Sequence, residues 1–419
     1  MVITLVIDMF GSQNNGTTVT CMRTAKLLKE HGNEVRIVAY IPEDSSDDLL
    51  SEYKVFRCGT IHVPVFQPLI DANGYTIAKV EDYHALADFL KGSDLVHLMT
   101  PLPLAWNVRR VAKVMGIATS SAMHLQPENI SFNIHMGHIN AVNSFIYWFF
   151  KHTTIRYTEH VHTPSEMMCD QMRLHNYHNR IHAISNGVAS RFVPTPSEKP
   201  EELKDKYVIL MVGRLSGEKR QDLIIKAIGH SKYNDRIQLI LCGQGPRRKQ
   251  YEKLSRKYLK NPCIFAFLSQ DDLLKTINYA DLYIHASDAE SEAISCIEAF
   301  SCGKVPVISD SAVSATNHFA LDERCLFKAG DWKSLRDRIE YWMEHGEEKE
   351  ELSKKYVEYG KTFNLENCVY KLEDMFRQAI EDDRRDKENH IEYYHSKKEN
   401  KKLRKAAKRA GIENPCIVE

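Results

Sequence analysis

The sequence predicts an α/β protein of two domains, each built on a doubly wound parallel sheet. Residues 2–7 (VITLVI) suit a buried strand, residues 17–31 an amphipathic helix and residues 34–40 a second strand, and this order begins such a sheet. Another apolar strand, residues 207–212 (YVILMV), restarts the pattern near the middle of the chain. The 419 residues are enough for two domains, each with its own core.

The composition excludes several classes of protein. Hydrophobic residues make up 43% of the chain and charged residues 27%, which is normal for a globular protein. Because 56 Lys and Arg balance 56 Asp and Glu, no overall charge draws the chain to nucleic acid, and we expect no such partner. The N-terminus lacks a signal-peptide pattern, and the ten cysteines lack paired metal-ligand spacing. We therefore expect reduced thiols and a cytoplasmic location.

Two positions in the first half are candidates for ligand contact. Gly16 ends a turn-rich loop, residues 8–16 (DMFGSQNNG), where a backbone can approach a ligand; a simple strand-to-helix turn explains the loop equally well. His124 follows a predicted strand, residues 117–122, at the edge where open α/β sheets bind ligands. A lone histidine is more often structural, so the position alone assigns no role.

Two glutamates in the second half surround the start of a predicted helix, residues 293–299. Glu290 follows a short strand at residues 280–286 (ADLYIHA), and Glu298 lies inside the helix. Both carboxylates can therefore serve one pocket at the carboxyl end of the strand. The alternative is a pair of solvated surface glutamates.

A basic loop follows the strand at residues 207–212. Its sequence, GRLSGEKR at residues 213–220, places Arg214 and Lys219 between a strand and a helix. An arginine fork and a lysine point charge suit the oxygens of a phosphate. The alternative is a basic surface loop with no ligand.

These motifs together resemble the retaining GT-B glycosyltransferases of the glycogen-synthase and mannosyltransferase clan, glycosyltransferase family 4. The resemblance rests on the two glutamates eight positions apart, on CGKVPV at residues 302–307 and on the loop at residues 213–220. It covers about residues 1–380 and implies a GT-B fold of two Rossmann-like domains facing across a cleft.

The resemblance also implies roles for single residues. Glu290 would bind donor-sugar hydroxyls and Glu298 the nucleotide ribose, while Arg214 and Lys219 would hold the diphosphate and His124 would lie beside the anomeric carbon. The implied catalytic set is His124, Arg214, Lys219 and Glu290, and the implied donor-binding set is Gly16, Arg214, Lys219, Gly243, Leu268, Glu290, Ser291, Ala293, Ile294 and Glu298. The sequence departs from the family at Ala293, where glycine is usual.

The expected reaction is transfer of glucose or galactose from a UDP-sugar to a hydroxyl, with retention at the anomeric carbon. The leaving diphosphate gains negative charge as the glycosidic bond breaks, and preplaced cations stabilise it. Since Arg214 and Lys219 can supply that charge and no Asp-x-Asp follows a predicted strand of either domain, we expect no metal and no cofactor.

The sequence favours a lipid acceptor, diacylglycerol or ceramide. Residues 127–129 (PEN) are similar to a segment of diacylglycerol glucosyltransferases. Residues 145–150 (FIYWFF) suit either a bilayer interface or a domain core, and the basic residues 397–409 suit either an anionic membrane surface or a solvated tail without a core-forming pattern. We expect a peripheral location at the inner face of the cell membrane. The alternatives are a soluble or polysaccharide acceptor, or an inactive nucleotide-sugar-binding protein.

The sequence predicts four segments. The expected segments are an N-terminal acceptor domain at residues 1–192, a nucleotide-sugar domain at residues 193–365, a helix returning to the first domain at residues 366–384 and a basic tail at residues 385–419. Residues 193–201, rich in Pro, Ser and Glu, are the expected linker.

Overall fold

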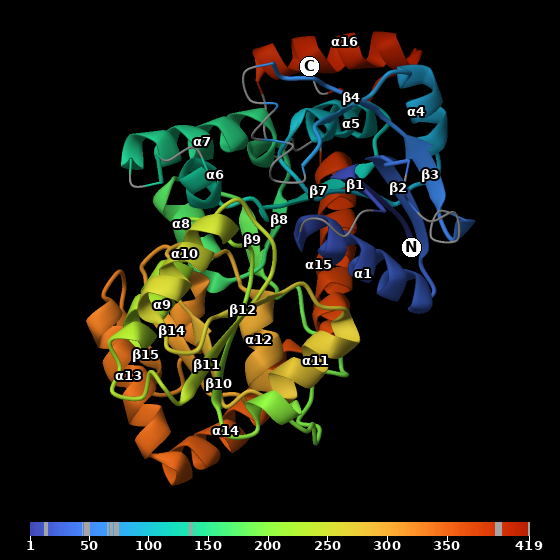
Figure 1. Cartoon of the computed structure of the whole chain (residues 1–419). Coiled ribbons are helices and arrows are strands. Elements are labelled where there is room, and N and C mark those ends of the chain that lie inside the picture. The colour runs from blue at the N-terminus through green and yellow to red at the C-terminus, as the bar shows by residue number, and fades with distance from the viewer. Residues whose placement is uncertain are drawn as a thin grey trace. The chain divides into compact units, whose positions relative to one another are not determined.

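The computed structural model describes residues 1–11, 16–43, 45, 51–64, 67, 70, 75–133, 136–137, 139–389 and 396–417 (Figure 1). Residues 12–15 of the predicted glycine-containing loop therefore lie outside the described residues. Contacts divide the chain into two compact units. The first consists of Met1–Pro127, Ile139–Ile184 and Val369–Glu419, and the second of Glu128–His138 and Ser185–Cys368.

The first unit is built on a parallel sheet of seven strands in the order β3-β2-β1-β6-β7-β8-β9. The strands are β1 (Val2–Met9), β2 (Glu34–Tyr40), β3 (Lys54–Arg57), β6 (Leu95–Leu98), β7 (Ala118–Ala122), β8 (His160–Thr163) and β9 (Arg180–Ala183). A separate antiparallel pair consists of β4 (Gly59–Thr60) and β5 (Ala78–Lys79). Almost every residue of β1 is buried, which explains its continuous apolar run.

The helices of the first unit differ in how they begin, and side chains cap some of them. They are α1 (Gly16–Glu30), α4 (Tyr83–Leu90), α5 (Pro103–Val114), α7 (Asn140–Thr153), α8 (Glu166–Leu174) and α16 (Lys397–Ala410), with a 3-10 turn at Ile155–Tyr157. Asp82 accepts a hydrogen bond from the Ala85 amide at 3.0 Å, and Ser165 accepts one from the Met168 amide at 3.3 Å. Proline at the first position of α5 has the φ angle that a helix start needs.

The second unit contains a parallel sheet of six strands in the order β12-β11-β10-β13-β14-β15. The strands are β10 (Tyr207–Val212), β11 (Ile237–Cys242), β12 (Ile264–Ala266), β13 (Leu282–His285), β14 (Pro306–Asp310) and β15 (Leu326–Lys328). Strands β11 and β12 extend the sheet to one side of β10, and β13, β14 and β15 extend it to the other. This is the strand order of a Rossmann fold, so the prediction of doubly wound parallel sheets is confirmed in both units.

The remaining helices complete the second unit and lead back to the first. They are α6 (Pro127–Asn133), α9 (Gln221–Gly229), α10 (Arg248–Tyr258), α11 (Gln270–Tyr279), α12 (Ile294–Ser301), α13 (Trp332–Glu344), α14 (Gly346–Gly360) and α15 (Leu365–Glu388). Short 3-10 helices lie at Glu201–Leu203, Ala315–Phe319, Glu323–Cys325 and Lys361–Phe363. No helix among the described residues is both long and apolar enough to cross a bilayer.

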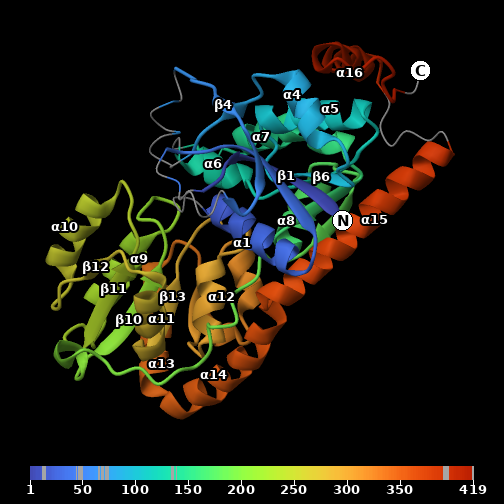
Figure 2. The same ribbon diagram turned by 90° about the vertical axis from the view of Figure 1, so that its right-hand side faces the viewer.

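The chain from Gly346 to Glu388 breaks into two helices, α14 and α15. The chain breaks because it pairs with another segment: the Leu365 amide donates to the Val188 carbonyl at 3.0 Å, and the Val188 amide donates to the Phe363 carbonyl at 2.8 Å. A Cβ at Gly360 would lie 2.5 Å from Ser301 Oγ, so the end of α14 needs glycine for close packing. From there α15 runs on to Glu388 (Figure 2).

The prediction that residues 397–409 lack a core-forming pattern is wrong. They form α16, which lies across α4 and α5 in both views (Figures 1 and 2). Leu403, Ala406, Ala407 and Ala410 are buried on its inner face. The buried Glu399 pairs with Arg109 and, at 3.2 Å, with Arg110 of α5. The apolar pattern was missed because these small apolar residues are scattered among lysines in the sequence. A single apolar stripe along one face is enough to pack a helix against its neighbours.

The aromatic run at residues 145–150 is buried on one face of its helix and exposed on the other. In α7, Tyr147 and Phe150 are buried, and the Tyr147 carbonyl accepts a hydrogen bond from the Tyr177 hydroxyl at 2.7 Å. Phe145 is 61% exposed and Trp148 53% exposed, with their rings stacked at 5.9 Å. One face of α7 therefore belongs to the core, and the other presents aromatic rings to the surroundings.

Candidate functional site

The second unit gathers polar side chains at the carboxyl ends of β10 and β13. These strands are neighbours, and the helices that follow them lead to opposite edges of the sheet. Their loops therefore diverge at this point and leave the crevice in which open α/β sheets bind ligands. The loop after β10 carries Arg214 and Lys219, and the loop after β13 carries Glu290.

The Glu290 carboxylate is the centre of this group. One oxygen, Oε1, pairs with the Lys219 ammonium and accepts a hydrogen bond from Ser287 Oγ at 3.0 Å. The same oxygen lies 2.9 Å from His285 Nε2. The buried Tyr283 hydroxyl lies 3.3 Å from the other nitrogen of that imidazole. Strand β13 thus supplies a polar row that fixes the position of the carboxylate.

Glu290 is ionised although it is buried. Burial by itself raises the pKa of this carboxyl, but the positive charge of Lys219 and the hydrogen bond from His285 outweigh that effect and hold the pKa at about 2. The site therefore keeps a fixed negative charge at neutral pH. Its partner Lys219 is 17% exposed, so the pair borders solvent on the lysine side.

Two glycines bring the loop after β10 close to the loop after β11. A Cβ at Gly243 would lie 2.1 Å from the Gly213 carbonyl oxygen, a contact that no other residue permits. The Leu215 amide donates to the Gln244 carbonyl at 2.9 Å, which holds the two loops together. Arg214 is half-buried in this arrangement, and burial lowers its pKa.

Helix α12 carries the other residues that the resemblance singled out. Glu298 is buried in its interior, while Ser291 and Ile294 are half-buried at its start. Ala293 precedes the helix with φ 66° and ψ 68°, a left-handed conformation. This explains the glycine usual in the family, because alanine costs about 1 kcal/mol or more in that conformation.

The other predicted residues lie away from this group. Leu268 is half-buried two residues after β12, on the same edge of the same sheet. Gly16 is the exposed first residue of α1, and His124 follows β7; both belong to the first unit. The structure therefore brings Lys219 and Glu290 into direct contact and divides the predicted set between the two units.

His124 is a neutral imidazole with a buried, unused nitrogen. It is 9% exposed, and its ring meets that of His162 edge-on at 5.0 Å. Burial and the nearby imidazoles lower its pKa well below the usual range. Within the described part of the chain, its Nε2 atom has no hydrogen-bond partner.

Two family models match most of the chain. "Glycosyltransferase Family 4" matches residues 14–191, and "Glycosyl transferases group 1" matches residues 194–363. The chain belongs to glycosyltransferase family 4. The family, the GT-B fold and the glycosyltransferase activity implied by the motifs are thus confirmed.

Individual relatives of this glycosyltransferase differ in what they act on. The GDP-mannose-dependent alpha-mannosyltransferase of Corynebacterium glutamicum is 22% identical over 321 residues, 74% of this chain and 73% of the relative. The GPI3 subunit of phosphatidylinositol N-acetylglucosaminyltransferase from Saccharomyces cerevisiae is 29% identical over 130 residues, 29% of this chain and 28% of the relative. Anabaena HepE in complex with UDP and glucose has a TM-score of 0.67 and 16% identity, covering 90% of this chain and 99% of that one.

Sequence reasoning missed three buried polar residues at or beside the candidate site. His285 and Ser287 were taken only as part of the strand and loop before Glu290, although they hold its carboxylate. Glu292 is also buried, and its oxygens accept hydrogen bonds from Ser185, from the Asn186 amide at 3.0 Å and from Asn186 Nδ2 at 2.6 Å. The sequence offered two signals for these residues. His285 is polar in an otherwise apolar strand, and Glu292 follows Glu290 by two positions.

Burial gives Glu292 a different charge state from Glu290. Burial raises the pKa of Glu292 to about 7, even though the hydrogen bonds from Ser185 and Asn186 favour the ionised form. No cation faces it among the described residues, in contrast to Glu290 with Lys219. The carboxyl ties the first residues of the second unit to the loop that carries Glu290.

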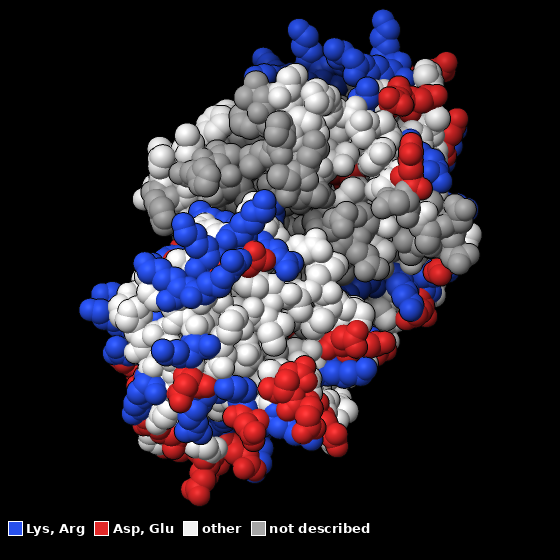
Figure 3. Space-filling model, in the orientation of Figure 1, with Lys and Arg blue, Asp and Glu red and all other residues white. Residues whose placement is uncertain are grey.

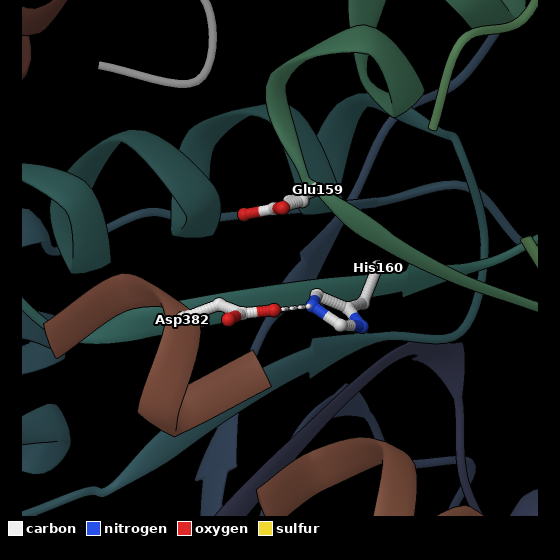
Figure 4. A group of neighbouring side chains, drawn as sticks. All are labelled: Glu159, His160 and Asp382. Atoms are coloured by element: carbon white, nitrogen blue, oxygen red, sulfur yellow. Dashed lines mark hydrogen bonds and ion pairs between the residues drawn. The ribbon is translucent and has the colours of Figure 1, made fainter. Parts of the chain in front are cut away.

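One group of metal-ligating types lies elsewhere in the glycosyltransferase. Ligand atoms of Glu159, His160 and Asp382 lie within 4.8 Å of one another (Figure 4). Arg180 contacts Glu159 at 3.0 Å and Asp382 at 2.9 Å, and Arg385 contacts Asp382 at 2.6 Å. These guanidinium groups neutralise the carboxylates and oppose a cation. The cluster therefore fastens α15 to β8 and β9 rather than forming a metal centre.

Proposed function

We propose that the enzyme transfers glucose or galactose from a UDP-sugar to a hydroxyl of a membrane lipid, with retention at the anomeric carbon. The observation that carries the proposal is the Lys219–Glu290 pair, set among His285 and Ser287 where β10 and β13 diverge. A cation and a fixed carboxylate side by side suit a donor that is a diphosphate at one end and a polyol at the other. The relatives support a nucleotide-sugar donor, because they include a GDP-mannose-dependent enzyme and a protein solved in complex with UDP and glucose.

In the proposed donor site, cations bind the diphosphate and carboxylates bind the sugar and the ribose. Arg214 and Lys219 hold the diphosphate and stabilise the negative charge that it gains as the glycosidic bond breaks. Glu290 accepts hydrogen bonds from hydroxyls of the sugar, and it can do so because its low pKa keeps it ionised. Glu298, on α12, binds the ribose. Lys219 then contacts both the diphosphate and Glu290, which aligns the two ends of the donor.

Retention requires the acceptor to attack the anomeric carbon on the same face from which the leaving group departs. In this proposal the leaving diphosphate takes the acceptor proton on that face, with no protein nucleophile. By its resemblance to the family, His124 is placed near the anomeric carbon in this proposal, and its low pKa keeps the ring neutral. Because the cations of the loop at residues 213–220 supply the charge, the proposal needs no metal.

A lipid acceptor is supported by two surfaces of the first unit. The exposed rings of Phe145 and Trp148 suit the headgroup level of a bilayer. The outer face of α16 carries a row of basic side chains, Lys397, Lys398, Lys401, Arg404, Lys405, Lys408 and Arg409. Figure 3 shows these blue side chains gathered over α16. Anionic headgroups attract such a face, which supports a peripheral location at the inner side of the cell membrane. The relative named for phosphatidylinositol also acts on a lipid.

A transfer assay tests the proposal. Purified enzyme is incubated with a membrane-lipid extract and radiolabelled UDP-glucose, UDP-galactose or GDP-mannose, with Glu290→Gln as the inactive control. We expect label from a UDP-sugar in the organic phase and, by proton NMR of the product, the same anomeric configuration as in the donor. Label found only in water-soluble product contradicts the lipid acceptor, and an inverted product contradicts retention.

A further inference from the structure

A third cation, Arg247, packs against the loop that carries Arg214 and Lys219. Arg247 directly precedes α10, and its amide donates to the Leu215 carbonyl at 3.0 Å. Its guanidinium covers Gly217, since a Cβ on that glycine would lie 2.8 Å from Nη2 and 2.9 Å from Cζ. Absence of a side chain at residue 217 is therefore what lets the guanidinium reach the loop.

Tyr251 fixes the position of the Arg247 side chain. The fully buried Tyr251, one turn along α10, hydrogen bonds to the Arg247 side chain. Its hydroxyl also donates to the Ser216 carbonyl at 2.8 Å. Tyr251 thus joins the guanidinium to the loop at residues 213–220, so the two move as one body. A preorganised guanidinium loses little entropy when it binds a planar or tetrahedral anion.

Arg247 is half-buried and has no carboxylate partner within the described ranges. The neighbouring Arg248 is exposed and pairs with Glu252 at 2.9 Å. A partly desolvated cation without a counter-charge costs free energy unless an anion binds it. Lys219 shares its charge with Glu290, so a further cation beside Arg214 adds to the positive charge that a diphosphate on this loop meets.

We propose that Arg247 is a further donor-binding residue that contacts the diphosphate of the nucleotide sugar from the α10 side. This inference rests on the proposed function, because it assumes the same ligand on the same loop. Arg247 then supplies the charge that Lys219 shares with Glu290. The fork of its guanidinium suits two phosphate oxygens at once.

The test compares nucleoside diphosphates with nucleosides. Binding of UDP and GDP is measured by calorimetry, and that of uridine and guanosine by ligand-observed NMR, for the wild-type protein, Arg247→Gln, Arg247→Lys and the matched control Arg248→Gln. We expect Arg247→Gln to weaken diphosphate binding about ten- to hundredfold, the loss of one charge-assisted contact, and to leave nucleoside binding unchanged. Arg247→Lys should recover part of the loss, and Arg248→Gln should bind as the wild type does.

A second variant, at Gly217, perturbs the Arg247 guanidinium without changing Arg247 itself. Gly217→Ala adds a methyl group against the flexible end of Arg247 and should displace the guanidinium, with a smaller loss of diphosphate affinity. If Arg247→Gln and the wild type bind diphosphates with equal affinity, the inference is overturned. If Arg247→Gln weakens nucleoside binding as much as diphosphate binding, Arg247 has a structural role and the inference is also overturned. Wild-type protein that binds neither diphosphate overturns the proposed donor class and this assignment with it.

Discussion

The Lys219 ammonium forms an ion pair with the Glu290 carboxylate, and both side chains are mostly buried. The pair joins the loop after β10 to the loop after β13, so the proposed diphosphate ligand and the proposed sugar ligand share one contact. A substitution at Lys219 raises the pKa of Glu290, because Lys219 is a main cause of the low pKa of that carboxyl. Single substitutions here must therefore be compared on ligands that engage only one end of the donor.

Glu290 and Glu298 should differ in the ligand that they bind. Glu298→Gln should weaken binding of UDP, because its proposed partner is the ribose. Glu290→Gln should leave free UDP nearly unaffected and weaken only the intact UDP-sugar. Calorimetry with both ligands on both variants measures the difference. Equal losses for both ligands in both variants would refute this division of roles.

The sheets and the site loops could be predicted from the sequence because both follow local patterns. Strand β10 has the predicted bounds, residues 207–212, since buried parallel strands are continuous apolar runs. Glu290 and Lys219 were found because each follows such a run. Their direct contact was not predictable, because it depends on the register of two strands that are 70 residues apart.

Other features depend on tertiary packing that no local pattern encodes. The break after Gly360 arises from pairing with Val188, far away in the sequence. The burial of Glu399 in α16 depends on Arg109 of α5. Glu292 was missed for the same reason: its partners, Ser185 and Asn186, are over 100 residues earlier. A lysine-rich stretch and a second glutamate each have an ordinary solvated interpretation in the sequence alone.

Glu292 should make stability depend on pH. Its folded-state pKa of about 7 lies above the ordinary 4.5, so the folded protein holds the proton more tightly than the unfolded chain. Its contribution to stability is complete below about pH 4.5 and is lost as pH rises to about 7. We expect the wild type to lose on the order of 2 to 3 kcal/mol from this group between pH 5 and pH 8. Thermal unfolding of wild type and Glu292→Gln at both pH values measures it; an identical pH dependence of the two proteins contradicts the assignment.

Transfer should continue without divalent metal. The cations near the proposed diphosphate site are protein side chains, and the carboxylates of Glu159 and Asp382 are occupied by arginines. Activity and thermal stability should both survive EDTA treatment. Loss of activity in EDTA that Mg²⁺ or Mn²⁺ restores would show that the enzyme uses a metal.

The outer face of α16 should bind anionic membranes. Deleting the helix would uncover α5, so substitution of Lys397, Lys401, Lys405 and Lys408 by Gln is the cleaner change, since all four are exposed. At roughly 1 kcal/mol per basic residue near an anionic surface, flotation with phosphatidylglycerol vesicles should fall strongly at low salt and differ little at high salt.

The matched control for the α16 variant replaces the same number of exposed lysines outside α16. Gln at the exposed Lys354, Lys355, Lys361 and Lys371 should leave flotation unchanged. Turnover on detergent-dispersed acceptor should be normal in both variants. If the α16 variant floats as well as the control at low salt, this face is only solvated.

Turnover of Lys219→Ala with saturating donor tests the proposed donor site most directly. Loss of this preplaced charge should cost about 2 to 4 kcal/mol of transition-state stabilisation, a fall in kcat of roughly 30- to 1000-fold. The control Lys275→Ala removes an exposed lysine of the same unit and should keep wild-type kcat. Thermal unfolding of each variant establishes that the fold is intact. A folded Lys219→Ala enzyme with near-normal kcat would contradict the placement of the departing diphosphate beside Lys219 and Glu290.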